Sequence, residues 1–144
     1  MKPKHFLDQL DEARILAAIA AAEQKSSGEV RIYVSGEKVA DSLAAAQVQF
    51  ARLGMEKTQD RNGVLLFFAP KSQQFAIVGD TGIHEKCGPD YWHEISGRMT
   101  VLLKNGRFTE AVVEAITRMG DVLASHFPRA QGDRNELTDE IAGD

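Results

Sequence analysis

Cysteine is nearly absent from this sequence of 144 residues, in which Cys87 stands alone. A single thiol cannot form an internal disulfide, so the chain is not a small secreted scaffold held together by disulfides. A lone cysteine also fits a reducing compartment, and we expect a cytoplasmic location.

Long hydrophobic runs are absent as well. The run from Val64 to Ala69 has the length of a strand, and the alanine-rich run from Ile15 to Ala22 is only slightly longer, whereas a membrane-spanning helix needs about 20 residues. We therefore expect no membrane span. The basic segment from Lys2 to His5 is not followed by the apolar core of a signal peptide, so we do not expect export in this form.

Positive charge is scarce, since 17 Lys and Arg residues face 21 Asp and Glu residues and the net charge is −4. Proteins that bind nucleic acid irrespective of sequence neutralise phosphates with Lys and Arg, so nucleic acid is not an expected partner. The GxGxxG, phosphate-loop, GxSxG, HExxH and EF-hand patterns are all missing. Nucleotide cofactors, serine hydrolysis and zinc proteolysis therefore have no motif in their support.

The sequence does contain a regular succession of helix and strand patterns. The predicted helices cover residues 11–26, 42–53, 89–104 and 109–126, and the predicted strands cover residues 29–35, 64–69 and 75–78. Because the run 64–69 does not alternate, that strand should be covered on both faces and central. The order calls for an α/β domain, a three-layer α/β/α sandwich whose mixed sheet combines a parallel crossover with an antiparallel hairpin.

The chain changes character after Pro128. From Arg129 to Asp144 it is polar and acidic, and Leu137 and Ile141 are its only large apolar residues. Such a segment cannot bury enough apolar surface to fold by itself. We therefore predict one domain over residues 1–128 and a disordered C-terminal tail over residues 129–144.

The predicted hairpin has a geometric consequence. If its centre lies between Lys71 and Ser72, Val64 pairs with Gly79 and Gly63 lies opposite Asp80. The loop 60–62 then lies beside Asp80, and the parallel strand that begins at Glu29 starts at the same edge. Polar residues from distant parts of the sequence should meet at one end of the sheet.

These residues could bind a divalent cation. Glu29, Asp60, Asp80 and the amide of Asn62 are hard oxygen donors, and Ca²⁺ takes about six to eight such oxygens. The alternative is a structural network of turn residues, in which Arg61 compensates the acidic charge. The sequence leaves both readings open.

Two other readings use residues nearby. His84, Cys87 and His93 fall within one short stretch, but a structural zinc site normally has four ligands in paired spacing, and Cys87 fits better as a small core residue. A metal-assisted phosphatase could use the acidic end of the sheet, with Arg61 orienting the phosphate. A structural interaction domain that binds no metal is the third possibility.

Several ordered motifs resemble the TPM domain family. They are Ser27-Gly28-Glu29-Val30-Arg31, Asp60-Arg61-Asn62-Gly63-Val64 with Ala69-Pro70, Val78-Gly79-Asp80-Thr81-Gly82-Ile83-His84, Asn105-Gly106-Arg107-Phe108 and His126-Phe127-Pro128. The resemblance spans about Phe6 to Pro128. It implies a Rossmann-like α/β/α sandwich.

The resemblance also implies candidate functions. Plant thylakoid-lumen members of the family are linked to photosystem II repair and reported as acid phosphatases, and some relatives bind calcium. Carried onto this chain, this implies a calcium site at Glu29, Asp60, Asn62 and Asp80, with Arg61 and His84 as substrate-binding residues. It also implies a protein partner, with a membrane-associated one as an option, although the signal peptide and membrane helix of many bacterial relatives have no counterpart here.

Overall fold

The computed structural model describes residues 1–128 and 141–144. The helices are α1 (Pro3–Asp8), α2 (Glu12–Lys25), α3 (Ser42–Arg52), α4 (Thr81–Lys104) and α5 (Phe108–His126), with two 3₁₀ turns, η1 (Met55–Lys57) and η2 (Pro70–Ser72). The strands are β1 (Glu29–Val34), β2 (Gly63–Ala69), β3 (Gln74–Gly79) and β4 (Ala142–Gly143).

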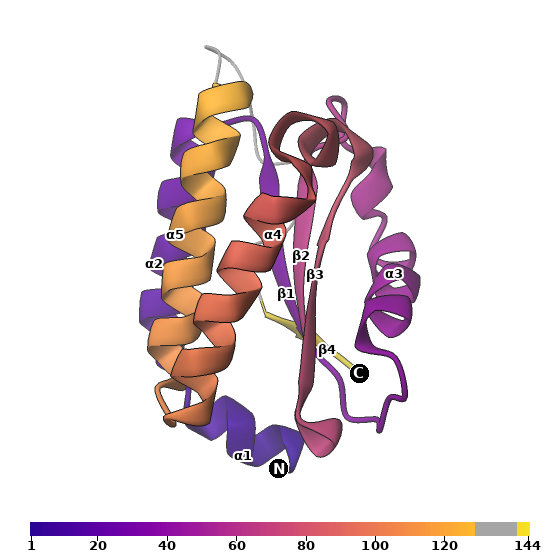
Figure 1. Ribbon diagram of the computed structural model, residues 1–144, viewed down its shortest axis with the longest axis vertical. Helices are drawn as coiled ribbons and strands as arrows, with labels where there is room; N and C mark the ends of the chain where they lie inside the picture. Colours follow the sequence, from indigo (N-terminus) through magenta and orange to yellow (C-terminus); the bar gives the residue numbers. More distant parts are fainter. Residues whose placement is uncertain (129–140) are drawn as a thin grey trace.

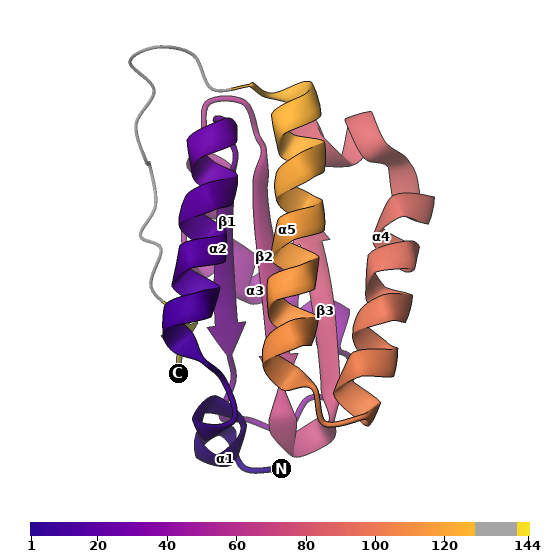
Figure 2. The same cartoon turned by 90° about the vertical axis from the view of Figure 1, so that its left-hand side faces the viewer.

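The strands form one mixed sheet between two helix layers. Their order is β3-β2-β1-β4, with β1 parallel to both β2 and β4, and β3 antiparallel to β2. Helices α2, α4 and α5 cover one face and α3 covers the other (Figure 1), and the first three lie side by side in the turned view (Figure 2). The predicted three-layer α/β/α sandwich with a parallel crossover and an antiparallel hairpin is confirmed.

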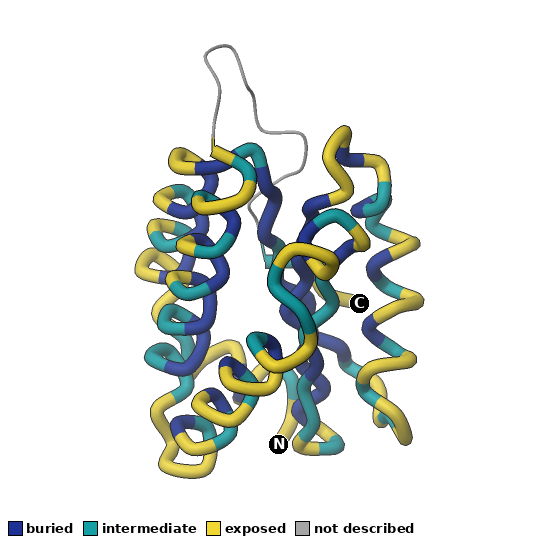
Figure 3. The backbone as a smooth tube through the Cα atoms, turned by 45° about the horizontal axis from the view of Figure 1, so that its top comes forward, coloured by how far each residue is buried: buried dark blue, intermediate teal, exposed yellow. Residues whose placement is uncertain are grey.

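Strand β2 is buried over its whole length, as its unbroken apolar run predicts. Val64, Leu66 and Phe68 belong to the core under α2, α4 and α5, whereas Leu65 and Phe67 belong to the core under α3. Figure 3 shows the burial concentrated in the sheet and on the helix sides that face it. Each such side chain stabilises the fold by about 1.5–3 kcal/mol relative to an exposed one, so β2 anchors the sheet.

Two helices in the first half of the chain, α2 and α3, begin next to aspartate caps. The Asp11 carboxylate accepts a hydrogen bond from the Arg14 amide at 3.3 Å, and the Asp41 carboxylate accepts one from the Ala44 amide at 3.1 Å. These bonds satisfy amides that have no partner within the first turn of a helix.

Helix α4 begins eight residues before the predicted start at Pro89, at Thr81. The Asp80 carboxylate caps this earlier start by accepting a hydrogen bond from the Thr81 amide at 2.7 Å. The helix is interrupted only by a kink at Gly88, whose φ of 74° lies in the left-handed region that glycine tolerates. Gly82 thus lies within the first turn of α4.

Two elements were not predicted from the sequence. Helix α1 is short, and its apolar anchor is the single buried residue Phe6. Strand β4 adds Ala142 and Gly143 to the outer edge of β1. Residues 129–140 of the predicted tail lie outside the described residues, and the domain boundary at residue 128 stays a prediction.

No helix in the described part of the chain combines the length and the apolar character that crossing a membrane would require.

Candidate functional site at one end of the sheet

The strand register brings the predicted site residues to the same end of the sheet. Val64 pairs with Gly79, and the Asp80 amide donates to the Gly63 carbonyl at 2.9 Å. Glu29, the first residue of β1, is the parallel partner of Gly63. The predicted hairpin centre and the common edge are both confirmed.

Arg61 and Asp80 form a two-point ion pair at this end. The Arg61 Nε lies 2.8 Å from Oδ2 of Asp80, and its Nη2 lies 3.0 Å from Oδ1. The Arg61 side chain is 50% exposed, whereas that of Asp80 is 5% exposed. The hydrogen bonds to Asp80 and its negative charge raise the pKa of Arg61 above its ordinary value, so this cation is permanently charged.

Asp60 and Asn62 form a second group, joined by a side chain that the sequence did not place in the site. The Ser27 hydroxyl donates to Oδ2 of Asp60 at 3.1 Å and accepts from Nδ2 of Asn62 at 3.1 Å. Asn62 is buried, and its backbone amide donates to the Thr58 hydroxyl at 3.2 Å. The amide of Asn62 is thus oriented by its contacts, while Asp60 remains exposed.

The backbone of the 58–62 loop adopts an unusual conformation at Arg61. Arg61 has a φ of 52°, in the left-handed region that non-glycine residues adopt rarely. The Gly82 amide donates to the Arg61 carbonyl at 2.8 Å, and a Cβ on Gly82 would lie only 2.1 Å from the Asp60 carbonyl oxygen. Glycine at position 82 therefore lets the first turn of α4 dock against the 58–62 loop.

Two further glutamates belong to this region. Glu29 is 2% exposed at the start of β1. Glu56, on η1, has a buried Oε2 atom without a hydrogen-bond partner among the described residues, and its charge contributes to the raised pKa of Arg61. No sequence pattern pointed to Glu56, because its relation to Arg61 depends on how η1 folds back over the loop.

The acidic residues share one end of the sheet without forming a tight cage. Within residues 1–128 and 141–144, no group of three or more His, Cys, Asp or Glu side chains is arranged so that it could hold a metal ion. Both oxygens of Asp80 are engaged by Arg61. Metal binding at Glu29, Asp60, Asn62 and Asp80 remains a prediction.

His84, the other predicted substrate-binding residue, lies one turn into α4. Its Nδ1 accepts a hydrogen bond from the Trp92 indole at 3.2 Å. The ring is therefore tied to the other side of the Gly88 kink, and this hydrogen bond joins it to an aromatic residue rather than to Arg61. Nearby, burial raises the pKa of the Cys87 thiol, which is opposite to the shift of an activated nucleophile.

The comparisons with known proteins agree with this architecture. The family model described as the TPM domain matches residues 1–122. Among curated proteins, none matches this sequence.

Two solved structures are similar to the chain. The solution structure of the BA42 protein from the psychrophilic bacterium Bizionia argentinensis is 32% identical, covers 92% of both chains and superposes with a TM-score of 0.84. The N-terminal domain of the cg2496 protein from Corynebacterium glutamicum is 16% identical, with a TM-score of 0.57 over 89% of this chain and 80% of that one, and it shares the fold alone. The chain therefore belongs to the TPM domain family.

Proposed function

We propose that this TPM domain is a divalent-cation-binding module, that Ca²⁺ is its cation, and that the site lies between the 58–62 loop and the first turn of α4. The observation that carries the proposal is the convergence of Asp60, Asn62 and Asp80 on one end of the sheet. These residues offer carboxylate and amide oxygens, which are the ligands that Ca²⁺ prefers.

Some of the predicted ligands are suited to bind a cation, and others are too deeply buried to reach one easily. Asp60 is exposed, and Asn62 is positioned by Ser27. The buried Oε2 of Glu56 has no hydrogen-bond partner among the described residues, and burying such an oxygen is costly unless it is compensated. A cation near Arg61 would provide that compensation. Asn62 and Glu29 are almost completely buried and are the least accessible of the predicted ligands.

Asp80 can contribute only if Arg61 releases it. Arg61 is half exposed, so its guanidinium can move into water, but Asp80 is only 5% exposed and its carboxylate would be left unpaired at high cost unless a cation replaced the guanidinium. We propose that the cation and Arg61 compete for the Asp80 carboxylate. The left-handed backbone at Arg61 supports this, because strained residues gather at ligand-binding segments.

Thermal melts with and without Ca²⁺ test the proposal. A ligand at one hundred times its dissociation constant stabilises the native state by about 2.7 kcal/mol, so Ca²⁺ should raise the melting temperature and chelator should reverse the effect. Asp60→Asn and Asp80→Asn should each reduce the Ca²⁺-dependent shift. Asp90→Asn removes the same charge from an exposed position beyond the kink and should leave it unchanged.

A wild-type melt that does not respond to Ca²⁺, or an equal response in Asp60→Asn, would refute a calcium site here. If Mg²⁺ and Zn²⁺ were also without effect, the reading as an interaction domain without metal would replace it. The comparison of cations also identifies which one the site prefers, because Mg²⁺ demands a tighter and more regular oxygen shell than Ca²⁺.

Weak phosphomonoester hydrolysis at the same end is a second candidate function. The half-exposed guanidinium of Arg61 beside the Asp80 carboxylate favours it, since guanidinium groups bind phosphate oxygens. A bound cation would supply Lewis-acid chemistry. Hydrolysis of p-nitrophenyl phosphate should then be slower in both Asp60→Asn and Arg61→Ala than in the wild type. A hydrolysis rate that is the same in all three proteins would come from a contaminating phosphatase.

A further inference from the structure

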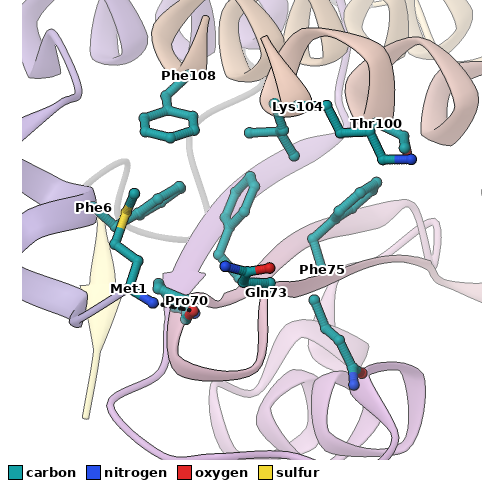
Figure 4. Close-up of a pocket in the computed structure, with 11 residues that line it drawn as sticks. Met1, Phe6, Pro70, Gln73, Phe75, Thr100, Lys104 and Phe108 are labelled. Atoms are coloured by element: carbon teal, nitrogen blue, oxygen red, sulfur yellow. Dashed lines mark hydrogen bonds between the residues drawn. The ribbon is translucent and has the colours of Figure 1, made fainter. Parts of the chain in front are cut away.

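A second candidate site lies at the opposite end of β2 from the acidic residues. There, α1, the β2–β3 turn, the C-terminal end of α4 and the start of α5 surround a cavity of about 430 Å³ (Figure 4). Its lining residues are Met1, Phe6, Phe68, Pro70, Gln73, Gln74, Phe75, Thr100, Leu103, Lys104 and Phe108. The volume is within the range of small-molecule sites, about 300–1,000 Å³.

Four phenylalanine rings form a continuous row along this cavity. The centroid of Phe6 lies 5.1 Å from that of Phe68 and 5.6 Å from that of Phe108, and Phe68 lies 6.3 Å from Phe75. Phe6 and Phe68 are buried, while Phe75 and Phe108 are only half buried. The two outer rings of the row, Phe75 and Phe108, are thus the more exposed ones, and the two inner rings are buried, so the row forms an apolar and elongated lining.

The charge around the opening has one sign. Lys104 is the only lining residue with a charged side chain, and it forms no salt bridge with any residue that the structure describes. The α-ammonium of Met1, another lining residue, donates a hydrogen bond to the Pro70 carbonyl at 3.1 Å. Lys2 and Lys71 are exposed and adjoin the lining residues Met1 and Pro70. In a chain with a net charge of −4, this end is locally basic.

The polar groups at the opening differ in their availability. The side chain of Gln74 already accepts from the Ser42 amide and donates to the Val39 carbonyl. Gln73 is exposed, so its amide can donate to a ligand. Lys104 and Thr100 are four residues apart and lie on one side of α4, above the ring row (Figure 4).

We propose that this cavity binds a single-chain aliphatic carboxylate, a medium-chain fatty acid. Its hydrocarbon chain would lie along the phenylalanine row, and its carboxylate would meet the Lys104 ammonium and the Gln73 amide at the opening. The match rests on an elongated apolar lining with a positively charged mouth, where Lys104 forms no salt bridge with a described residue, and this suits a ligand with one apolar end and one negative charge. The site is separate from the cation site and does not depend on it.

Calorimetric titration with decanoate below its micelle concentration, in the presence of chelator, tests the proposal. Decanoate should bind saturably with one molecule per chain, and decanol, which has the same chain without the charge, should bind more weakly. In two-dimensional NMR spectra the decanoate-induced shifts should concentrate on the lining residues. Shifts that concentrate instead around Asp60 and Asp80 would overturn the assignment.

Two variants test the two halves of the site. Lys104→Glu should weaken decanoate binding roughly fivefold, as expected for a partly exposed ion pair, and should leave decanol binding unchanged. Lys86→Glu makes the same charge change at an exposed position outside the lining and should have no effect. Thr100→Trp places an indole in the cavity and should abolish binding of both ligands.

Absence of decanoate binding to the wild-type protein overturns the proposal. Binding that survives both Lys104→Glu and Thr100→Trp also overturns it, because the ligand would then lie elsewhere. An anionic membrane surface also combines acyl chains with negative charge. Cosedimentation with vesicles containing phosphatidylglycerol distinguishes binding to such a surface from binding of a free fatty acid. If the protein binds such vesicles but not free decanoate, the basic end recognises a membrane surface and the fatty-acid site is excluded.

Discussion

Arg61 and Asp80 are joined by two hydrogen bonds, of 2.8 Å and 3.0 Å, across the end of the sheet where the 58–62 loop meets α4. The pairing neutralises a carboxylate that also caps the helix by accepting from the Thr81 amide. It occupies both oxygens that a cation would use. The competition between Arg61 and a cation is therefore the central mechanistic question at this site.

Arg61→Ala should strengthen Ca²⁺ binding while destabilising the Ca²⁺-free protein. The substitution frees both Asp80 oxygens and removes a repulsive positive charge, but it leaves a nearly buried carboxylate without its partner. Calorimetry gives the affinity, and melts in chelator give the stability.

Arg98→Ala is the matched control for Arg61→Ala, because Arg98 is equally exposed and pairs with Glu114. It should change neither the Ca²⁺ affinity nor, to any large extent, the stability. Ca²⁺ binding that is weaker in Arg61→Ala than in the wild type would contradict the competition and would make Arg61 a supporting residue of the site.

Gly82→Ala should destabilise the fold by about 1–3 kcal/mol, the usual cost of forcing extra atoms into a packed contact. The new Cβ would lie 2.1 Å from the Asp60 carbonyl oxygen and 2.6 Å from the Arg61 carbonyl oxygen, so backbone must move. Gly97→Ala in the same helix meets nothing within 4 Å and should stabilise by about 0.5–1 kcal/mol. Urea unfolding of the two variants measures both effects, and equal values would mean that the loop adjusts freely.

The contact between Tyr33 and Asp144 should make stability fall at alkaline pH. Burial, together with the hydrogen bond to Asp144, raises the pKa of Tyr33 from 10.0 to about 12. The folded state thus keeps a proton that the unfolded state has lost, so this contribution is complete below pH 10 and disappears as the pH rises towards 12.

Unfolding measured over this pH range checks the Tyr33 prediction. Tyr33→Phe should lose this part of the pH dependence, whereas Asp144→Asn should reduce it. At the acidic end, Asp144 should contribute stability that is lost as the pH falls through its lowered pKa, because hydrogen bonds from Tyr33, Gly36 and Ser35 outweigh the opposing effect of burial. An alkaline profile that is the same in wild type and Tyr33→Phe would show that the contact is absent in solution.

Cys87 should react slowly with iodoacetamide in the folded protein at neutral pH. Burial raises the pKa of its thiol, which lowers the fraction of reactive thiolate. The rate should increase with pH and should reach that of a free thiol in urea. Rapid alkylation of the folded protein at neutral pH would instead indicate an activated thiolate and would support a catalytic role for Cys87.

The β2–β3 hairpin shows which features of the site the sequence predicts and which it does not. A short polar turn between two apolar runs specifies the pairing of Val64 with Gly79, because a slip by one residue would turn buried side chains outward. From that register the shared edge of Glu29 and Asp80 follows directly. Which groups contact one another there does not follow, since Ser27 and Asp60 are brought together only when α2, β1 and the loop are packed.

Helix α4 and the phenylalanine cavity mark the limit of local patterns. Glycine at position 82 reads as a helix breaker in isolation, and only the close approach of the 58–62 loop explains a helix that includes it. Phe6, Phe68, Phe75 and Phe108 lie on four separate elements and have no common spacing. No local pattern could therefore predict their row.

The sequence by itself determined the α/β/α layers, the central position of β2 and the gathering of acidic residues at one end, because apolar periodicity and strand register are local and repetitive signals. Tertiary packing alone decided that Arg61 would hold Asp80, that Ser27 would join Asp60 to Asn62, and that a cavity with a positively charged mouth would form at the other end. Those contacts join residues distant in the chain, and their energies depend on distances and burial that exist only after the layers have packed.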